Sequence, residues 1–226
     1  MTALSKTEEL KRSLAAIPGV KSVGDVKIKN DIIEYIAIDT GAAGKITVRR
    51  LDVNDAPQLY EFYTEGLSEK PKVLFAPYPL FHTSPGSAGE LAMRIADWKK
   101  ENDWTAVILV KDERIIGFCM LKRFYTKNVT SGIAVSDEFA RKGMGLLLQK
   151  IIVEQARLLN LTGFHVKIVS DNWASVRLHE KCGFRITKTL PQPLYVEILE
   201  YLRQKDISDG KHKVDRQIIE VVVDFV

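Results

Sequence analysis

The chain has 226 residues, of which 46% are hydrophobic and 27% are charged, and its formal net charge is +4. This balance is typical of a globular protein with one substantial core, so it excludes the fibrous and disordered classes. The positive charge is small and scattered along the chain, and we therefore expect no nucleic-acid partner.

The sequence shows no pattern of export or membrane insertion. No segment has the roughly 18 uninterrupted apolar residues of a spanning helix, and the start, MTALSKTEELKRS, lacks a signal core. Cys119 and Cys182 lie far apart in apolar surroundings, which matches neither a metal site nor a disulfide framework. We expect a soluble, cytoplasmic protein with no membrane contact and no metal.

The first part of the chain is expected to form a helix and a β-hairpin. Apolar residues recur at helical spacing over residues 5–16, and Pro18-Gly19 ends that pattern. Two extended runs follow at residues 20–29 and 32–40, and Asn30-Asp31 between them is a typical turn.

A short Gly/Ala segment, residues 41–44, follows this hairpin and is the best candidate for a linker. The strand-like sequence KITVRRL begins directly after it. We therefore predict an N-terminal extension, residues 1–44, and a main domain, residues 45–226. The hairpin of the extension offers a surface for pairing, which leaves a homodimer open.

The main domain alternates strands and helices. One antiparallel hairpin among interleaved elements predicts an α/β (α+β) fold with a mixed sheet flanked by helices. The expected elements are a strand at 46–51, a helix at 54–67, a Pro-rich segment at 68–86, a helix at 87–101, a hairpin of 104–110 and 115–123, a strand at 128–135, a helix at 145–159, a strand at 164–170, a helix at 173–181, a strand at 184–189, a helix at 194–203 and a closing strand at 213–226.

The most informative stretch joins the strand 128–135 to a strongly amphipathic helix. Arg141 and Lys142 precede Gly143, Met144 and Gly145, where that helix begins. A helix N-terminus exposes unpaired N–H groups and a partial positive charge, so it binds phosphate well. The glycines let phosphate approach the backbone, and the two cations add charge. The stretch predicts a pyrophosphate-binding loop, although a tight structural turn would show the same pattern.

A second motif lies one strand later, in the segment NWASVRLHEKCGF at residues 172–184. Together, the two motifs resemble the general-control-type N-acetyltransferase (GNAT) superfamily over residues 46–190. Members of that family carry a phosphate loop of the form Q/R-x-x-G-x-G/A and then N-x-x-A/S-x-x-L-Y-x-K-x-G-F. The matching positions are Gly143, Gly145, Asn172, Ser175, Leu178, Lys181, Gly183 and Phe184.

Two positions depart from the family's pattern. Ala140 stands where members have Gln or Arg, so one usual phosphate contact is missing and Arg141 or Lys142 has to compensate. His179 stands where the family most often has tyrosine, as in variants similar to phosphinothricin-type acetyltransferases.

The resemblance implies a GNAT-type, mostly antiparallel sheet and acetyl-CoA as co-substrate. It implies transfer of an acetyl group to a primary amine by direct attack in a ternary complex. A small-molecule amine is slightly preferred over a protein N-terminus or lysine as the acceptor. A non-catalytic acyl-CoA sensor remains an alternative.

The resemblance also implies roles for individual residues. His179 would protonate the departing thiolate, or it would be a structural histidine bonded within the fold. Asn172 would bind the pantetheine arm, cap the following helix, or do both. An N–H of Ala134 or Val135 would face the developing oxyanion. The implied cofactor-binding set is Ile133, Ala134, Val135, Arg141, Lys142, Gly143, Met144, Gly145, Asn172 and Ser175.

The sequence does not identify a general base. Many relatives have a glutamate on the strand before the phosphate loop, where this chain has Thr, Ser and Gly at 130–132. Water, Glu61, Glu65 and His82 remain candidates. The aromatic segment 75–82 is expected to line the acceptor side, bordered by the helix at 194–203.

Overall fold

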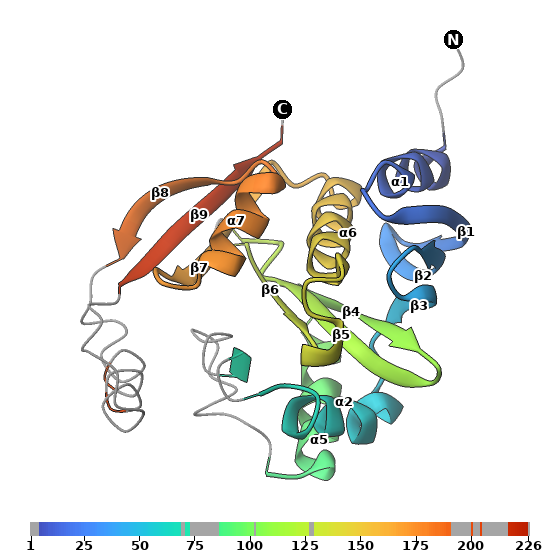
Figure 1. Ribbon diagram of the computed structural model, residues 1–226, viewed down its shortest axis with the longest axis horizontal. Helices are drawn as coiled ribbons and strands as arrows, with labels where there is room; N and C mark the ends of the chain where they lie inside the picture. The colour runs from blue at the N-terminus through green and yellow to red at the C-terminus, as the bar shows by residue number, and fades with distance from the viewer. Residues whose placement is uncertain are drawn as a thin grey trace.

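The computed structural model describes residues 5–68, 71–72, 86–101, 103–126, 129–190, 200, 204 and 217–225. These residues form a nine-stranded sheet in the order β1-β2-β3-β4-β5-β6-β7-β9-β8 (Figure 1). All neighbouring strands run antiparallel except β6 and β7, which are parallel. The predicted mixed, mostly antiparallel sheet is confirmed.

The elements follow the predicted order. The helices are α1 (Lys6–Ala15), α2 (Ala56–Thr64), α5 (Ala88–Lys100), α6 (Met144–Leu158) and α7 (Trp173–Lys181), with 3-10 turns η1 (Val53–Asp55) and η2 (Asp137–Phe139). The strands are β1 (Val20–Lys29), β2 (Ile32–Thr40), β3 (Gly44–Arg50), β4 (Trp104–Lys111), β5 (Arg114–Lys122), β6 (Thr130–Val135), β7 (Gly163–Val169), β8 (Arg185–Leu190) and β9 (Ile218–Asp224).

Two predicted segments fall largely outside the described residues. They are the Pro-rich segment at 68–86, which contains the aromatic run 75–82, and the helix expected at 194–203. The closing strand is described over Ile218–Asp224, inside its predicted range of 213–226. None of the described helices has the length and apolar character of a membrane-spanning segment.

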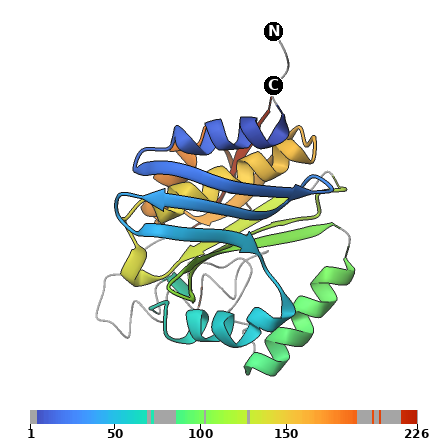
Figure 2. The same cartoon turned by 90° about the vertical axis from the view of Figure 1, so that its right-hand side faces the viewer.

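Helices cover both faces of the sheet and produce two apolar cores (Figure 2). α1 and α6 lie on one face, where Leu148 and Ile151 of α6 are fully buried. α2 and α5 lie on the other face, where Leu59 and Ile95 are fully buried. Burying an aliphatic side chain of this size stabilises a fold by about 1.5–3 kcal/mol. The packing therefore holds α6, which begins at the predicted phosphate loop, firmly against the sheet.

The N-terminal extension shares the core of the main domain. β1 and β2 continue the sheet beyond β3, and Leu10 and Leu14 of α1 pack into the core that α6 covers. Residues 41–44, expected as a linker, instead make the turn of the hairpin between β2 and β3, which closes with the pair Thr40 and Gly44. The tight turn leaves no flexible spacer there, and the domain boundary and the homodimer stay predictions.

A buried amide on α6 ties the extension to that helix. The Gln155 Oε1 atom accepts from the Ile33 N–H at 2.8 Å, and its Nε2 atom donates to the Asp31 carbonyl at 2.8 Å. Ser13 on α1 donates to the Glu154 carboxylate at 2.7 Å. Residues far apart in the sequence thus brace α6 on the side away from its N-terminus.

Candidate functional site

The sheet opens between β6 and β7. These two strands pair at one position only, Thr130 with His165, whereas β6 is paired with β5 along its whole length. Beyond Thr130 the two strands part, so among the described residues this edge of β6 is not paired with another strand. This arrangement leaves strand backbone available to an extended ligand.

Hydrogen bonds at the two ends of β6 show which residues face the opening. The His165 N–H donates to the Val129 carbonyl at 3.1 Å, and the Ser136 N–H donates to the Ile116 carbonyl of β5 at 3.0 Å. Backbone groups alternate in direction along a strand. Ile133 and Val135 therefore present their N–H and C=O groups to the opening.

Ala134 lies between these two residues and directs its backbone groups toward β5, opposite Phe118. The sequence left Ala134 and Val135 as equal candidates for the N–H that faces an oxyanion. The alternation favours Val135 and removes Ala134 from that role.

A groove of about 820 Å³ lies at this opening, between β6, the loop before α6, β7 and α7. It brings together most of the residues that the sequence singled out. Those that line it are Ile133, Ala134, Val135, Arg141, Gly143, Gly145, Asn172, Ser175 and His179.

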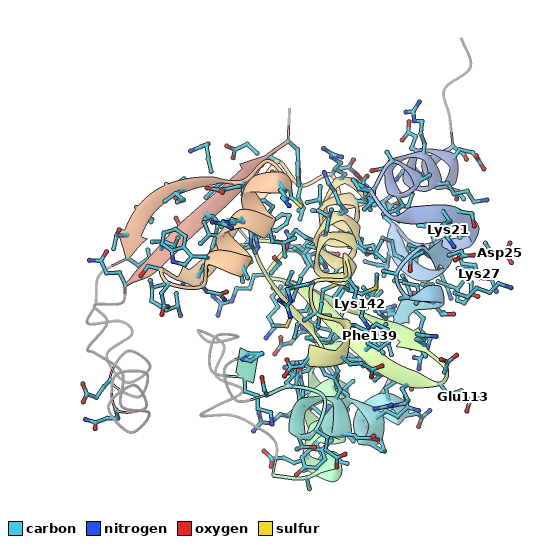
Figure 3. The ribbon with its side chains drawn as sticks, viewed as in Figure 1. Lys21, Asp25, Lys27, Glu113, Phe139 and Lys142 are labelled. Atoms are coloured by element: carbon cyan, nitrogen blue, oxygen red, sulfur yellow. The ribbon has the colours of Figure 1, made fainter. Side chains whose placement is uncertain are left out.

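Two predicted cofactor-binding residues direct their side chains elsewhere. The Lys142 Nζ atom lies 4.9 Å from the centre of the Phe139 ring, on the loop before α6 (Figure 3). The Met144 side chain is 2% exposed and packs into the core. Met144 can therefore offer a ligand its backbone N–H and not its side chain.

α6 begins without a side-chain cap at Gly143, which has the left-handed φ of 84°. A Cβ atom on Gly143 would meet no atom within 4 Å, so the space beside this turn is open. A Cβ atom on Gly145 would instead lie 3.4 Å from Leu178 Cδ2 of α7. Gly143 thus keeps the groove open at the helix start, and Gly145 allows α7 to approach α6.

The lining of the groove is mostly positive. Among the described lining residues, four carry a positive charge and one, Asp171, is a carboxylate. The four cations are Arg141, Lys167, Arg177 and Lys181. This excess of positive charge, together with an uncapped helix N-terminus, suits a polyanion.

Sequence reasoning did not assign binding roles to three residues of α7. Trp173, Arg177 and Lys181 follow one another at four-residue spacing, which places them on one face of the helix, and all three line the groove. Trp173 is 64% exposed. That spacing was a usable signal in the sequence.

Ser131 is another lining residue to which the sequence assigned no binding role. It drew attention only because it lies in the stretch where many relatives have a glutamate. Its side chain lines the groove, is 4% exposed, and its hydroxyl has no hydrogen-bond partner in the described part of the chain. A buried polar group in a native protein normally has a partner. The Oγ atom is itself shielded from solvent, so in this position the hydroxyl is not offered to the groove.

Asn172 caps α7. Its Oδ1 atom accepts from the Ser175 N–H at 3.3 Å, which satisfies one of the free amides at the start of the helix. Of its two predicted roles, capping is present in the structure and ligand binding stays a prediction.

His179 is 2% exposed, and its ring packs edge-on against Phe184 with centroids 4.9 Å apart. The Nδ1 atom lies 2.7 Å from the Ser175 carbonyl oxygen. Burial lowers the pKa of His179 from 6.5 to about 4, and the bond to Ser175 opposes that shift only in part. The imidazole is therefore neutral at pH 7. These features favour the structural alternative over a proton donor.

The candidates for a general base are not gathered at this groove. Glu61 and Glu65 line a different groove, and His82 lies outside the described residues. The base therefore stays unassigned.

Comparison with known proteins gives a family match. The sequence profile described as "Acetyltransferase (GNAT) domain" matches residues 45–185. A curated L-methionine sulfoximine/L-methionine sulfone acetyltransferase of Pseudomonas aeruginosa is 36% identical over 64 residues. That match covers 28% of this chain and 37% of the relative, so the chain spans little more than a third of the relative's length.

Solved structures share the fold at low sequence identity. The GNAT domain of S. lividans PAT has a TM-score of 0.60 and 15% identity, covering 80% of this chain and 92% of its own. Spermidine N-acetyltransferase from Vibrio cholerae, solved with CoA and spermine, has a TM-score of 0.58 and 15% identity, covering 79% of this chain and 94% of its own. The yncA protein of Salmonella typhimurium, solved with acetyl-CoA, has a TM-score of 0.56 and 18% identity, covering 79% of this chain and 93% of its own.

Proposed function

The chain belongs to the acetyltransferase (GNAT) domain family, and on that premise we propose that it is an N-acetyltransferase that moves the acetyl group of acetyl-CoA to a primary amine. The observation that carries the proposal is the groove between β6 and β7. It combines a helix start without a side-chain cap, a mostly basic lining and strand backbone that no described strand pairs with.

These features support a proposed position in the groove for each part of acetyl-CoA. The diphosphate would bind the first N–H groups of α6 beside Gly143, with Arg141 adding charge. Arg177 and Lys181 would attract the remaining phosphate. The amide-containing pantetheine arm would pair with the backbone of Ile133 and Val135, as a strand pairs with an open sheet edge.

Acetyl-CoA supplies a thioester, and the reaction needs no covalent bond to the protein. The nitrogen of a neutral amine attacks the thioester carbonyl, a C–N bond forms, the C–S bond breaks, and the proton lost by the amine balances the one gained by the thiolate. The Val135 N–H would stabilise the oxyanion, an interaction typically worth about 3 kcal/mol. The neutral His179 is poorly suited to protonate the departing thiolate, so the proton donor stays unassigned.

A small-molecule amine remains the preferred acceptor. The curated relative is named for acetylation of amino-acid derivatives, and a structural neighbour is named for spermidine. Another neighbour is named as an alpha-N-protein acetyltransferase, which keeps a protein terminus as the alternative acceptor.

The second candidate function is an acyl-CoA sensor without catalysis. Ala140 in the phosphate loop and the lack of a carboxylate at residues 130–132 favour it. To distinguish the two, purified protein is mixed with acetyl-CoA and a panel of amines, and release of free thiol is followed while calorimetry measures CoA binding. An enzyme releases thiol with at least one amine faster than by hydrolysis alone. Binding without release would support the sensor, and absence of CoA binding would contradict both.

A further inference from the structure

An exposed tryptophan lies on one wall of the groove between β6 and β7. Trp173 is the first residue of α7, lines the groove and is 64% exposed. The other two tryptophans, Trp98 and Trp104, pack against each other with ring centroids 5.0 Å apart. Among the described residues, no aromatic ring or cation packs on the Trp173 indole. Its ring face is therefore not used by the described part of the fold, although burial of so large a ring would stabilise it.

Two cations continue the same face of α7. Arg177 and Lys181 follow Trp173 at four-residue intervals, so the three Cα atoms are spaced about 6 Å apart along the helix axis. Both cations line the groove, and neither makes an ion pair with a described residue. A single exposed aromatic side chain is common on protein surfaces. An aromatic ring in a groove beside unpaired cations is instead typical of nucleotide binding, because the base stacks on the ring and the phosphate pairs with the cations.

This face of α7 borders the start of α6 (Figure 1). A Cβ atom on Gly145 would lie 3.4 Å from Leu178 Cδ2, and Leu178 directly follows Arg177 in the chain. The face formed by Trp173, Arg177 and Lys181 therefore lies beside the helix start at which the diphosphate is proposed to bind. Because the pantetheine arm is proposed to lie along β6, the nucleoside end of the coenzyme is left to the wall that α7 forms.

The nucleoside end of acetyl-CoA matches this face in both of its parts. Adenine is a flat ring whose π-face can stack on an indole. The phosphate on the ribose carries a charge of about −1.5 to −2 near neutral pH, which suits two neighbouring cations. The acetyl end matches less well, since it has neither a ring nor a charge.

We propose that Trp173 stacks on the adenine of acetyl-CoA while Arg177 and Lys181 bind the phosphate on its ribose. This subsite makes the chain selective for a free, nucleotide-ended thioester over the same acyl group carried on phosphopantetheine alone, as on a carrier protein. The inference rests on the proposed acetyltransferase function, because it needs acetyl-CoA in this groove. It adds to that function a stacking residue and a class of acetyl donor.

Calorimetric titration of the full chain with CoA tests the role of Trp173. Trp173→Ala should weaken CoA about tenfold, a size typical of one base stacked on an aromatic side chain. Trp173→Phe keeps a ring and should recover most of that loss. The matched control is Tyr125→Ala, which removes an aromatic side chain that is 74% exposed but is not part of the groove lining. This control should bind CoA as the wild type does.

Truncated ligands separate stacking from a general defect of the variant. Phosphopantetheine lacks the nucleoside, so Trp173→Ala should leave its affinity unchanged. 3′-Dephospho-CoA keeps adenine and lacks the ribose phosphate, so Trp173→Ala should still weaken it about tenfold. Arg177→Gln with Lys181→Gln should weaken CoA more than it weakens 3′-dephospho-CoA, because the charge that these cations bind is missing from the second ligand.

Tryptophan fluorescence gives an independent measurement. CoA should quench the emission of the wild type and quench Trp173→Phe less, since Trp98 and Trp104 do not line the groove. If the wild type binds CoA but Trp173→Ala binds it equally well, this inference is overturned and the acetyltransferase proposal stands. An equal loss for CoA and phosphopantetheine in Trp173→Ala would have the same consequence. No CoA binding by the wild type would overturn both.

Discussion

The Nδ1 atom of His179 lies 2.7 Å from the backbone carbonyl oxygen of Ser175, one turn earlier on α7. Because a carbonyl can only accept, this contact places the imidazole proton on Nδ1. Burial lowers the pKa of the ring to about 4, so the neutral ring is held in one orientation at pH 7. The predictions for His179 follow from this state.

The first prediction concerns stability against pH. His179 titrates near 6.5 in the unfolded chain and near 4 in the folded protein. Between these values the unfolded state binds the proton and the folded state does not. The free energy of unfolding should therefore fall by about 3 kcal/mol as the pH drops from about 6.5 to about 4. Urea unfolding at pH 7 and pH 4.5 measures this loss in the wild type and in His179→Asn. The free energy of unfolding should change less with pH in the variant, and an equal change in the two proteins would refute the prediction.

A second prediction concerns turnover. A general acid typically contributes a factor of about 100 to 10,000 in rate. If His179 is structural, His179→Asn should change kcat by only a few-fold once an acceptor amine is known. The measurement is kcat and KM for acetyl-CoA, with CoA affinity and circular dichroism as controls. A hundredfold loss in kcat with unchanged CoA affinity would restore the acid role.

The phosphate loop gives a third prediction. Gly143→Ala places a methyl group in the open space at the start of α6 and should weaken CoA binding at least tenfold. Gly19→Ala is the matched control, because Gly19 has a similar φ of 90° and also no atom within 4 Å of a Cβ, but lies outside the groove. Both variants should lose about 1–2 kcal/mol of stability from the left-handed conformation. Equal CoA affinity in the two variants, by calorimetry, would be incompatible with a phosphate site here.

The charged face of α7 gives a fourth prediction. Arg177→Gln with Lys181→Gln should weaken CoA roughly tenfold and reduce the dependence of binding on salt, since two charges that attract phosphate are lost. Lys11→Gln with Arg12→Gln on α1 makes the same change in net charge outside the groove. CoA titrations at low and high salt measure both effects. If the α1 variant weakens CoA equally, the attraction comes from overall charge and not from α7.

Two buried glutamines on α6 give a fifth prediction. Gln155 bonds to the backbone of Ile33 and Asp31, so Gln155→Met should cost about 2–4 kcal/mol by leaving those groups unpaired. Gln149 is also fully buried, but neither amide atom has a partner among the described residues. Gln149→Met should therefore be neutral or stabilising. Urea denaturation measures both, and a smaller loss for Gln155→Met than for Gln149→Met would contradict the assigned roles.

The order of the elements was predictable because it depends on local chemistry. Asn30-Asp31 and Pro18-Gly19 mark turns wherever they occur, and the spacing of apolar residues in the helix now bounded as Met144–Leu158 places it within one residue. The phosphate loop could be predicted for the same reason, since glycines, cations and a helix start lie next to one another in the chain; phosphate binding there stays a prediction.

Other features depended on contacts between distant residues. Residues 41–44 have the composition of a linker, but the pairing of β2 with β3 makes them a hairpin turn. The sequence does not distinguish Gly143 from Gly145. Only the position of Leu178 on α7 shows that Gly145 allows close packing of the two helices, whereas Gly143 lies beside open space. The groove that Glu61 and Glu65 line joins α2 to the turn between β4 and β5, about 50 residues later, which no local pattern indicates.

The sequence alone determined the kind of elements and their order, and it predicted a phosphate-binding loop, because these follow from spacing and turn chemistry within a few residues. The tertiary structure decided which backbone groups of β6 are open, that His179 is neutral, and that the N-terminal extension belongs to the main core. Those properties depend on which strand lies beside which and on how much water is excluded, and both are set only when distant parts of the chain pack together.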